Sequence, residues 1–241
     1  INLNTSKVEY AISVFYRASK FNQDINTKMV TTASGTSFLA WDMSSVGDMS
    51  YMFQGAKEFN QPIGNWNTSS VTNMPGMFSD TNAFNQNINK ETVTVNGNSY
   101  TAWDTSSVGN MSTMFSAAGA FNQPLDNWDT SSASDMNGMF FNAFTFNQNV
   151  GSWVVSSVNN MTSMFASAKA FNNGGSSDIT NWDTSNVENM SDMFGRMCPF
   201  NQPIIFWNVE KVTNFQNMFY EAPNFAQDIR IWKVKSDANT T

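Results

Sequence analysis

The sequence predicts an α/β solenoid of about eight 25-residue repeats, each with one short parallel strand and one short helix, and with two β-hairpin insertions. Every Trp of the chain occupies one position of the repeat: Trp41, Trp66, Trp103, Trp128, Trp153, Trp182, Trp207 and Trp232. The tripeptide Phe-Asn-Gln, or a close relative, recurs with it at Phe21, Phe59, Phe84, Phe121, Phe146, Phe171, Phe200 and Phe225. A unit this short cannot bury its apolar face alone, so the copies must stack as one domain over residues 1–241.

The helix is predicted from the apolar residues that follow each Asn-Met or Asp-Met pair. In one copy these are Met49, Met52, Phe53, Ala56 and Phe59, whose offsets of 3, 4, 7 and 10 trace one helix face. We expect this stripe to form the core. The residue before the first apolar position is predicted to be the helix N-cap in every copy: Asp48, Asn73, Asn110, Asp135, Asn160, Asn189 and Asn214.

The strand is predicted from the short segment that ends at each Trp, such as residues 62–66. Ile63 and Trp66 favour a strand, and Pro62 suits an extended backbone. We expect the Asn of Phe-Asn-Gln to bond to the backbone of neighbouring loops. The Trp column is expected to close the core; the alternative is an exposed aromatic row that stacks sugar rings.

Two copies contain long insertions, which we predict to be β-hairpins over Lys28–Ala40 and Lys90–Ala102. In the second, Asn96-Gly97 lies between β-branched and aromatic residues, a strong hairpin signal. The two insertions align without gaps when Lys28 is paired with Lys90. Because they enter the same strand in coils two apart, their bases should lie roughly 10 Å apart and form one projecting ridge.

The two ends of the sequence interrupt a repeat. After Trp232 the pattern dissolves into a ragged tail over residues 233–241. Terminal capping repeats normally shield the ends of a solenoid. We therefore expect a segment of a longer protein, or a chain that stacks end to end with copies of itself.

Composition argues against several classes of function. The net charge of −7 disfavours binding to nucleic acid, which needs a basic surface. The chain has no His, which excludes imidazole chemistry, and the lone Cys198 supplies no disulfide or metal framework. Asp42, Asp104, Asp129 and Asp183 share a register but do not form a calcium loop. We expect no enzyme activity, no cofactor, no metal site and no transmembrane segment.

The unit Trp-Asp-Thr-Ser-Ser-Val-x-Asn-Met-x-x-Met-Phe-x-x-Ala-x-x-Phe-Asn-Gln resembles the bacterial surface protein repeat of about 25–26 residues. That repeat occurs in lipoproteins and surface proteins of Listeria, Mycoplasma and other bacteria, and in marine protists and large algal viruses. It is similar to the BspA-like branch of leucine-rich repeats, with Met, Phe and Trp in place of Leu and Ile. The resemblance covers residues 3–232. It implies a leucine-rich-repeat-like fold and an extracellular surface or adhesion role, with no shared catalytic site.

Binding is predicted on the strand face, where the residues just before each Trp differ between copies. The candidates are Asn65, Asp126, Asn127, Thr180, Asn181 and Arg230. Repeat proteins commonly present such variable positions as an extended binding surface. Six sequons are candidate glycosylation sites if the chain is secreted by a eukaryote: Asn4, Asn67, Asn110, Asn160, Asn189 and Asn239.

The leading hypothesis is a non-enzymatic extracellular or cell-surface protein for adhesion, recognition or assembly, with a surface protein or glycan as its ligand. One alternative is a structural subunit of an extracellular filament, sheath or virion coat. A second is an ice-binding protein, suggested by the row formed by Thr68, Thr105, Thr130 and Thr184. Val155 and Val209 interrupt that row, and Ser and Thr often bond to their own backbone in turns, which favours a structural role.

Overall fold

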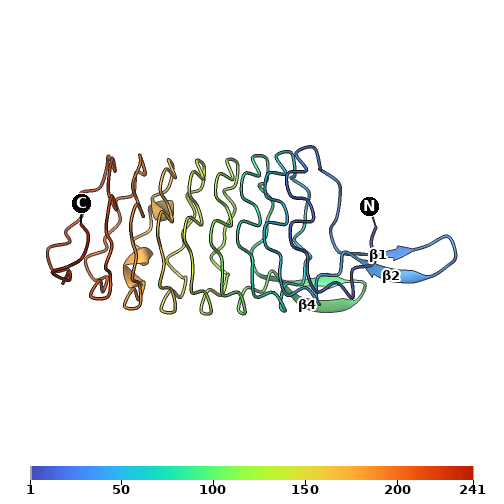
Figure 1. Cartoon of the computed structure of the whole chain (residues 1–241). Helices are drawn as coiled ribbons and strands as arrows, with labels where there is room; N and C mark the ends of the chain where they lie inside the picture. The colour runs from blue at the N-terminus through green and yellow to red at the C-terminus, as the bar shows by residue number, and fades with distance from the viewer. Residues whose placement is uncertain (1, 241) are drawn as a thin grey trace.

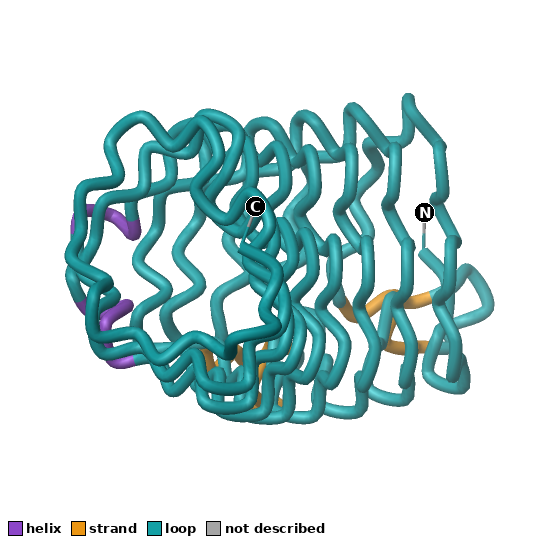
Figure 2. The backbone as a smooth tube through the Cα atoms, turned by 60° about the vertical axis from the view of Figure 1, so that its left-hand side comes forward, coloured by secondary structure: helices purple, strands orange, loops and turns teal. Residues whose placement is uncertain are grey.

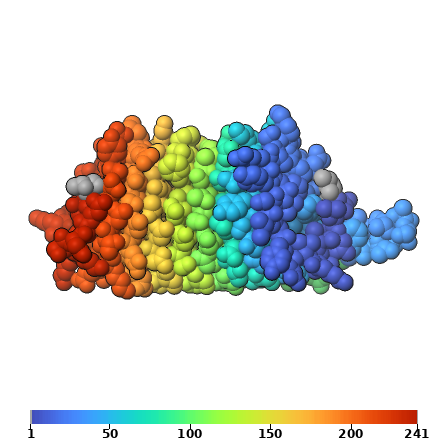
Figure 3. Space-filling view, in the orientation of Figure 1, coloured from blue at the N-terminus to red at the C-terminus, as the bar shows by residue number. Residues whose placement is uncertain are grey.

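The computed structural model describes residues 2–240, which wind into a row of coils stacked along one axis. Each repeat forms one coil, and sequence order is kept from one end of the row to the other (Figure 1). The space-filling view shows an elongated body from which one hairpin projects beyond the end that begins the chain (Figure 3). Consecutive repeats are therefore neighbours in space, as stacking requires.

The predicted α/β solenoid with a helix and a parallel strand in every repeat is wrong, and so is the leucine-rich-repeat-like fold. Residues 2–240 contain no α-helix, and most of the tube in Figure 2 is loop and turn. The elements are β1 (Lys28–Thr31), β2 (Ser37–Ala40), β3 (Glu91–Val95), β4 (Asn98–Ala102) and the short 3-10 segments η1 (Asn173–Gly175) and η2 (Asp178–Asn181). The strands form two separate antiparallel pairs, β1–β2 and β3–β4.

Tandem turns take the place of each predicted helix. The N–H of Met52 donates to the Met49 carbonyl at 3.2 Å, and the N–H of Ala56 donates to the Phe53 carbonyl at 2.9 Å. Tyr51, inside the first of these turns, has a φ of 57°, in the left-handed region that a right-handed helix excludes. Turns that repeat in this way return residues three and four apart to the same side, as a helix does. The apolar spacing therefore identified the buried residues and not the backbone conformation.

The remaining backbone groups bond between coils. The N–H of Thr113 donates to the Asn137 carbonyl at 2.7 Å, and the N–H of Phe115 donates to the Met139 carbonyl at 2.8 Å. Isolated parallel bridges join the coils in the order Tyr10, Asp48, Asn73, Asn110, Asp135, Asn160, Asn189, Asn214 and Asn239. Each coil is thereby paired with its neighbours through the backbone, without a regular strand.

The Asn or Asp predicted to cap each helix closes a side-chain turn instead. Oδ1 of Asn110 accepts a hydrogen bond from the N–H of Ser112, two residues later, at 2.9 Å. Asn73 is followed at that position by Pro75, which has no N–H to donate. Its Nδ2 donates to Oγ1 of Thr72 at 3.2 Å instead. Turn formation of this kind is the second common use of Asn and Asp.

The Met and Phe residues of the predicted stripe do form the core. Met111, Met114 and Phe115 are fully buried, as are their counterparts in the other central coils. Phe115 stacks between Phe78 and Phe140 of the adjacent coils, with ring centroids 5.6 Å and 5.4 Å away. Successive coils therefore bury one aromatic column along the axis, and the prediction of a core role for the stripe is confirmed.

The Asn of each Phe-Asn-Gln joins one coil to the next, which confirms its predicted structural role. Oδ1 of Asn122 accepts from the N–H of Asn147 at 2.9 Å and from Nε2 of Gln148 at 3.0 Å. The Asn ladder formed in this way consists of Asn22, Asn60, Asn85, Asn122, Asn147, Asn172 and Asn201. Each Oδ1 of the ladder thereby provides an acceptor for a backbone N–H of the next coil.

The Trp column is part of the core, as expected. Trp66 and Trp103 are fully buried, and their rings stack at 6.3 Å between centroids. The indole Nε1 of Trp103 donates to the carbonyl of Ile63 in the preceding coil at 2.9 Å. Trp232, in the last coil, is half-buried. An exposed Trp row that stacks sugar rings is therefore excluded for the central coils.

Both predicted hairpins are present. Lys28 pairs with Ala40 in the first, and Glu91 pairs with Ala102 in the second, so the second hairpin begins one residue later than predicted. Lys90 precedes it, so the pairing registers of the two hairpins differ by one residue although their sequences align without gaps. At the tip of the second hairpin, Asn96 and Gly97 have φ values of 51° and 81°, as the Asn-Gly turn requires.

Candidate functional site

The six residues predicted to form a binding face each lie one or two positions before a Trp of the column. Asp126, Asn127, Asn181 and Arg230 are exposed, and Asn65 and Thr180 are half-buried. Their contacts are local: Oδ1 of Asp126 accepts from Nδ2 of Asn89 at 2.8 Å, and Arg230 pairs with Asp228 at 2.8 Å. They belong to four coils, with Asp126 next to Asn127 and Thr180 next to Asn181, and do not converge on one pocket.

The row of threonines considered for ice binding does not face solvent. Thr68, Thr105, Thr130 and Thr184 are fully buried. Oγ1 of Thr105 donates to the carbonyl of Asp129 in the next coil at 2.9 Å, and its counterparts make the same bond. Each hydroxyl is thus committed to a bond between coils, and Val155 and Val209 fit the same buried position. This row has a structural role.

The predicted glycosylation sites occupy turns of the coils. Asn4 and Asn239 are exposed, whereas Asn67, Asn110, Asn160 and Asn189 are half-buried. Oδ1 of Asn67 and of the three Asn-Met residues accepts the N–H two residues later. Attachment of a glycan at the half-buried sites would have to keep or replace that turn.

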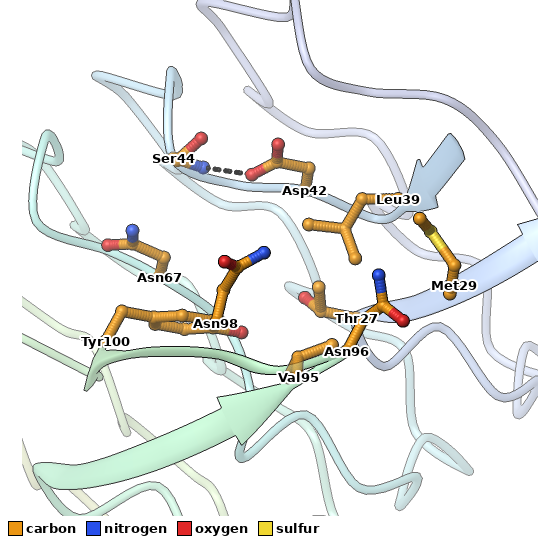
Figure 4. A pocket seen from close by; sticks show the side chains of 10 residues that line it. All are labelled: Thr27, Met29, Leu39, Asp42, Ser44, Asn67, Val95, Asn96, Asn98 and Tyr100. Carbon is orange, nitrogen blue, oxygen red and sulfur yellow. Dashed lines mark hydrogen bonds between the residues drawn. The ribbon is translucent and has the colours of Figure 1, made fainter. Parts of the chain in front are cut away.

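A hollow lies between the two hairpins. It has a volume of about 200 Å³ and is lined by Thr27, Met29, Leu39, Asp42, Ser44, Asn67, Val95, Asn96, Asn98 and Tyr100. We call it the hairpin cleft; Figure 4 shows its side chains. The first hairpin extends past the end of the stack, while the second lies along the same edge (Figure 1). The two therefore enclose a cleft rather than form the single projecting ridge that the sequence suggested.

Tyr100 holds the second hairpin against the stack. Its hydroxyl donates to the carbonyl of Asn65, and its ring packs with Val93 against the core. Burial raises the pKa of Tyr100; a hydrogen bond with Thr27 opposes the rise, and the negative charge of Asp42 adds to it. The phenol therefore stays neutral and fixes one wall of the hairpin cleft.

The base of the second hairpin is held by an ion pair. Nζ of Lys90 lies 3.0 Å from Oδ1 of Asp104, and both side chains are mostly shielded from solvent. Burial of Asp104 tends to raise its pKa, but hydrogen bonds from Lys90 and Ser106 outweigh it, and the pKa lies below its ordinary value. Lys90 is thus committed to Asp104 and leaves the cleft without a basic group.

The polar groups of the hairpin cleft are only partly used. Oδ1 of Asp42 accepts from the N–H of Ser44 at 3.0 Å, which leaves the second carboxylate oxygen for other partners. Among the described residues, the side-chain amides of Asn96 and Asn98 have no hydrogen-bond partner. Met29, Leu39 and Val95 supply an apolar wall. One carboxylate and free amides beside hydrocarbon suit binding of a ligand.

Residues 2–240 hold no cluster of three or more His, Cys, Asp or Glu side chains that could bind a metal ion. The same residues contain no helix with the length and apolar character needed to cross a bilayer.

The sequence indicated the second hairpin of the cleft but not how that hairpin packs against the coils. The Asn-Gly turn located the second hairpin, but no local pattern says that Tyr100 contacts Asn65, because the two are 35 positions apart. The orientation of a hairpin relative to its scaffold depends on such long-range contacts.

Comparison with known proteins identifies a family for the whole chain. A family model described as "Mycoplasma protein of unknown function, DUF285" matches residues 1–38, 27–96, 90–178 and 176–241 in tandem. No curated protein and no solved structure matches the chain. The four matches together cover the full sequence and agree with its internal repetition. The chain therefore belongs to the DUF285 repeat family.

Proposed function

We propose that this protein is a non-enzymatic recognition module that is displayed outside the cell and binds its partner at the edge that carries the two hairpins. The observation that carries the proposal is the hairpin cleft, a recess between the two insertions that combines the Asp42 carboxylate, the exposed amides of Asn96 and Asn98 and an apolar wall. The resemblance of the repeat to bacterial surface protein repeats supports the extracellular location.

The coils themselves favour a scaffold role. Their Asn, Thr and Trp side chains bond to neighbouring coils, and the described residues contain no buried side-chain N or O without a partner. A residue engaged in packing is not free to bind a ligand. The hairpins depart from the repeat, and insertions in repeat proteins commonly map to the binding face.

A variant without the hairpins tests the proposal. Deletion of residues 28–40 and 91–102 leaves Thr27 joined to Trp41 and Lys90 joined to Trp103, the spacing that residues 59–66 already show in an uninterrupted coil. Intact protein and variant would be applied to an array of glycans and short peptides. Binding by the intact protein that the variant loses supports the proposal, provided that both unfold cooperatively. No binding by the intact protein, or equal binding by both, contradicts it.

A structural subunit is the second candidate, and the end coils favour it. Tyr10, Ile12 and Val14 in the first coil expose much of their apolar side chains, as do Tyr220 and Val234 near the last. Apolar patches of this kind mark surfaces that associate. Sedimentation over a range of concentrations tests it: mass that grows with concentration, and that falls when Ile12 and Val14 are changed to Lys, supports stacking of copies. A constant monomer mass contradicts it.

A further inference from the structure

We infer that the hairpin cleft receives a Lys or Arg side chain of a protein partner. This inference rests on the proposed recognition function and names the chemistry of the ligand. It is carried by three features of the cleft: the sign of its charge, the hydrocarbon of its walls and the free acceptors at its mouth.

The charge of the cleft is negative. Asp42 is the one carboxylate among its lining residues, and no Lys or Arg lines it. Two lysines adjoin the cleft in the chain or the fold, and both are paired: Lys28, between the lining residues Thr27 and Met29, with Asp24 at 2.6 Å, and Lys90 with Asp104 at 3.0 Å. With one oxygen of Asp42 bonded to Ser44, the other is available to a cationic donor. The net charge of −7 also favours the approach of a basic partner.

The walls suit the aliphatic stem of a long basic side chain. Met29, Leu39 and Val95 form an apolar surface, and the side chain of Met29 is 44% exposed in the unbound protein. Lys and Arg bury their methylene groups along such surfaces while the charged head meets a polar partner. A volume of about 200 Å³ accommodates one such side chain and excludes a folded segment.

The mouth of the cleft offers neutral acceptors. In Figure 4 the amides of Asn96 and Asn98 lie on the side of the cleft that the second hairpin contributes, facing the wall that contains Asp42. Their carbonyl oxygens can accept from a guanidinium or ammonium group, which carries several donors. A sugar ring could use the same amides, but it would gain less from a full negative charge beside an apolar wall.

Titration with single basic ligands tests the inference. The probes are N-acetyl-arginine amide and N-acetyl-lysine amide, with N-acetyl-citrulline amide as the uncharged isostere and methyl glycosides as the sugar. The readout is the methyl resonance of Met29, with Met197 as an internal control because it is also exposed but lies outside the cleft. We expect the Met29 signal to shift with arginine or lysine amide and not with citrulline amide, and added salt to weaken the effect.

Asp42→Asn is the decisive variant, because Asn67 and Asn208 occupy the same position in other coils and make the same turn. The turn is therefore kept while the charge is removed. Asp183→Asn is the matched control, since Asp183 makes that turn outside the cleft. We expect Asp42→Asn to weaken binding of arginine amide about tenfold, the scale of one hydrogen bond to a charged group, and Asp183→Asn to leave it unchanged.

Three outcomes would overturn the inference: an unmoved Met29 signal with the basic amides, equal affinity of Asp42→Asn and the unaltered protein, or a shift with the methyl glycosides alone. These outcomes are separable from the fate of the proposed function. Array binding that depends on the hairpins, without a response of Met29 to the basic amides, keeps the recognition role and discards the basic ligand. If the Met29 signal responds to the basic amides, Asp42→Asn abolishes that response, and the array shows no binding, the basic ligand is kept and the recognition role is discarded.

Discussion

At the scale of single residues, one side chain can hold two coils together. In the Asn ladder, Asn122 accepts a backbone N–H and a side-chain amide from the same neighbouring coil. Because such an Asn recurs along the stack, each coil provides the hydrogen-bond acceptors that the next coil needs. The sequence predicted this role because a residue that recurs with Phe in nearly every copy serves the repeat and not a local site.

Asn122→Ala should therefore be costly. The N–H of Asn147 loses its acceptor, and the amide of Gln148 keeps only the backbone carbonyl of residue 122, so we expect the free energy of unfolding to fall by about 1–3 kcal/mol. Denaturant unfolding monitored by Trp fluorescence measures it. The control is Asn127→Ala, at an exposed position with one long bond of 3.4 Å, which should change stability by at most about 0.5 kcal/mol. Equal effects of the two substitutions would contradict the ladder.

Cys198 should be inert in the folded protein. It is fully buried, and burial raises the pKa of its thiol from 9.0 to about 12, against a smaller opposing effect of the Phe200 backbone. Thiolate is the reactive form, so the group stays protonated at pH 8. We expect no reaction with an aromatic disulfide reagent at pH 8 until denaturant is added, and then one thiol per chain. Rapid reaction of the native protein would show that the last coils open easily.

At the scale of elements, η1 and η2 lie in the copy where Trp153 and Trp182 are 29 positions apart, four more than Trp41 and Trp66. This four-residue insertion depends on a glycine of the preceding coil. A Cβ atom at Gly151 would lie 2.4 Å from Cβ of Asp178 and 2.7 Å from its carbonyl carbon. Those distances leave no room for a methyl group. The insertion, which the sequence located by spacing alone, is thus accommodated by a glycine in another repeat.

Gly151→Ala should destabilise the protein by about 1–3 kcal/mol, since the backbone around Asp178 must shift. Gly119→Ala is the matched control because no atom lies within 4 Å of its added methyl group. That change should be neutral, or stabilising by at most about 1 kcal/mol, because Ala lowers the conformational entropy of the unfolded chain. Thermal unfolding of the two variants compares them, and a stable Gly151→Ala protein would contradict the close contact.

The elements also show which features a sequence of this kind can predict. The second hairpin was predictable because Asn96-Gly97 favours one local turn. The helix was mispredicted because turns and helices share the spacing of three and four, and Asn or Asp begins both. Left-handed residues such as Thr113 and Ser163 decide between them, and neither residue type signals that conformation. The cleft was missed because it depends on contacts between repeats.

At the scale of the whole molecule, the coils are held by aromatic columns and by bonds from each coil to the next. Each coil contacts mainly its neighbours, so stability should accumulate coil by coil. Such a body can be long and stiff while it carries functional groups only at its insertions. The proposed recognition role requires this arrangement, because a regular stack leaves the two hairpins as its distinctive surface.

The most direct test of this account is detection of the hydrogen bonds between coils by NMR couplings across them. We predict a coupling between the amide nitrogen of Phe115 and the carbonyl carbon of Met139, and the equivalent coupling from Thr113 to Asn137. A coupling from Phe115 to the carbonyl of Met111, four residues earlier, would establish the helix that the apolar spacing suggested and would contradict the stacked turns.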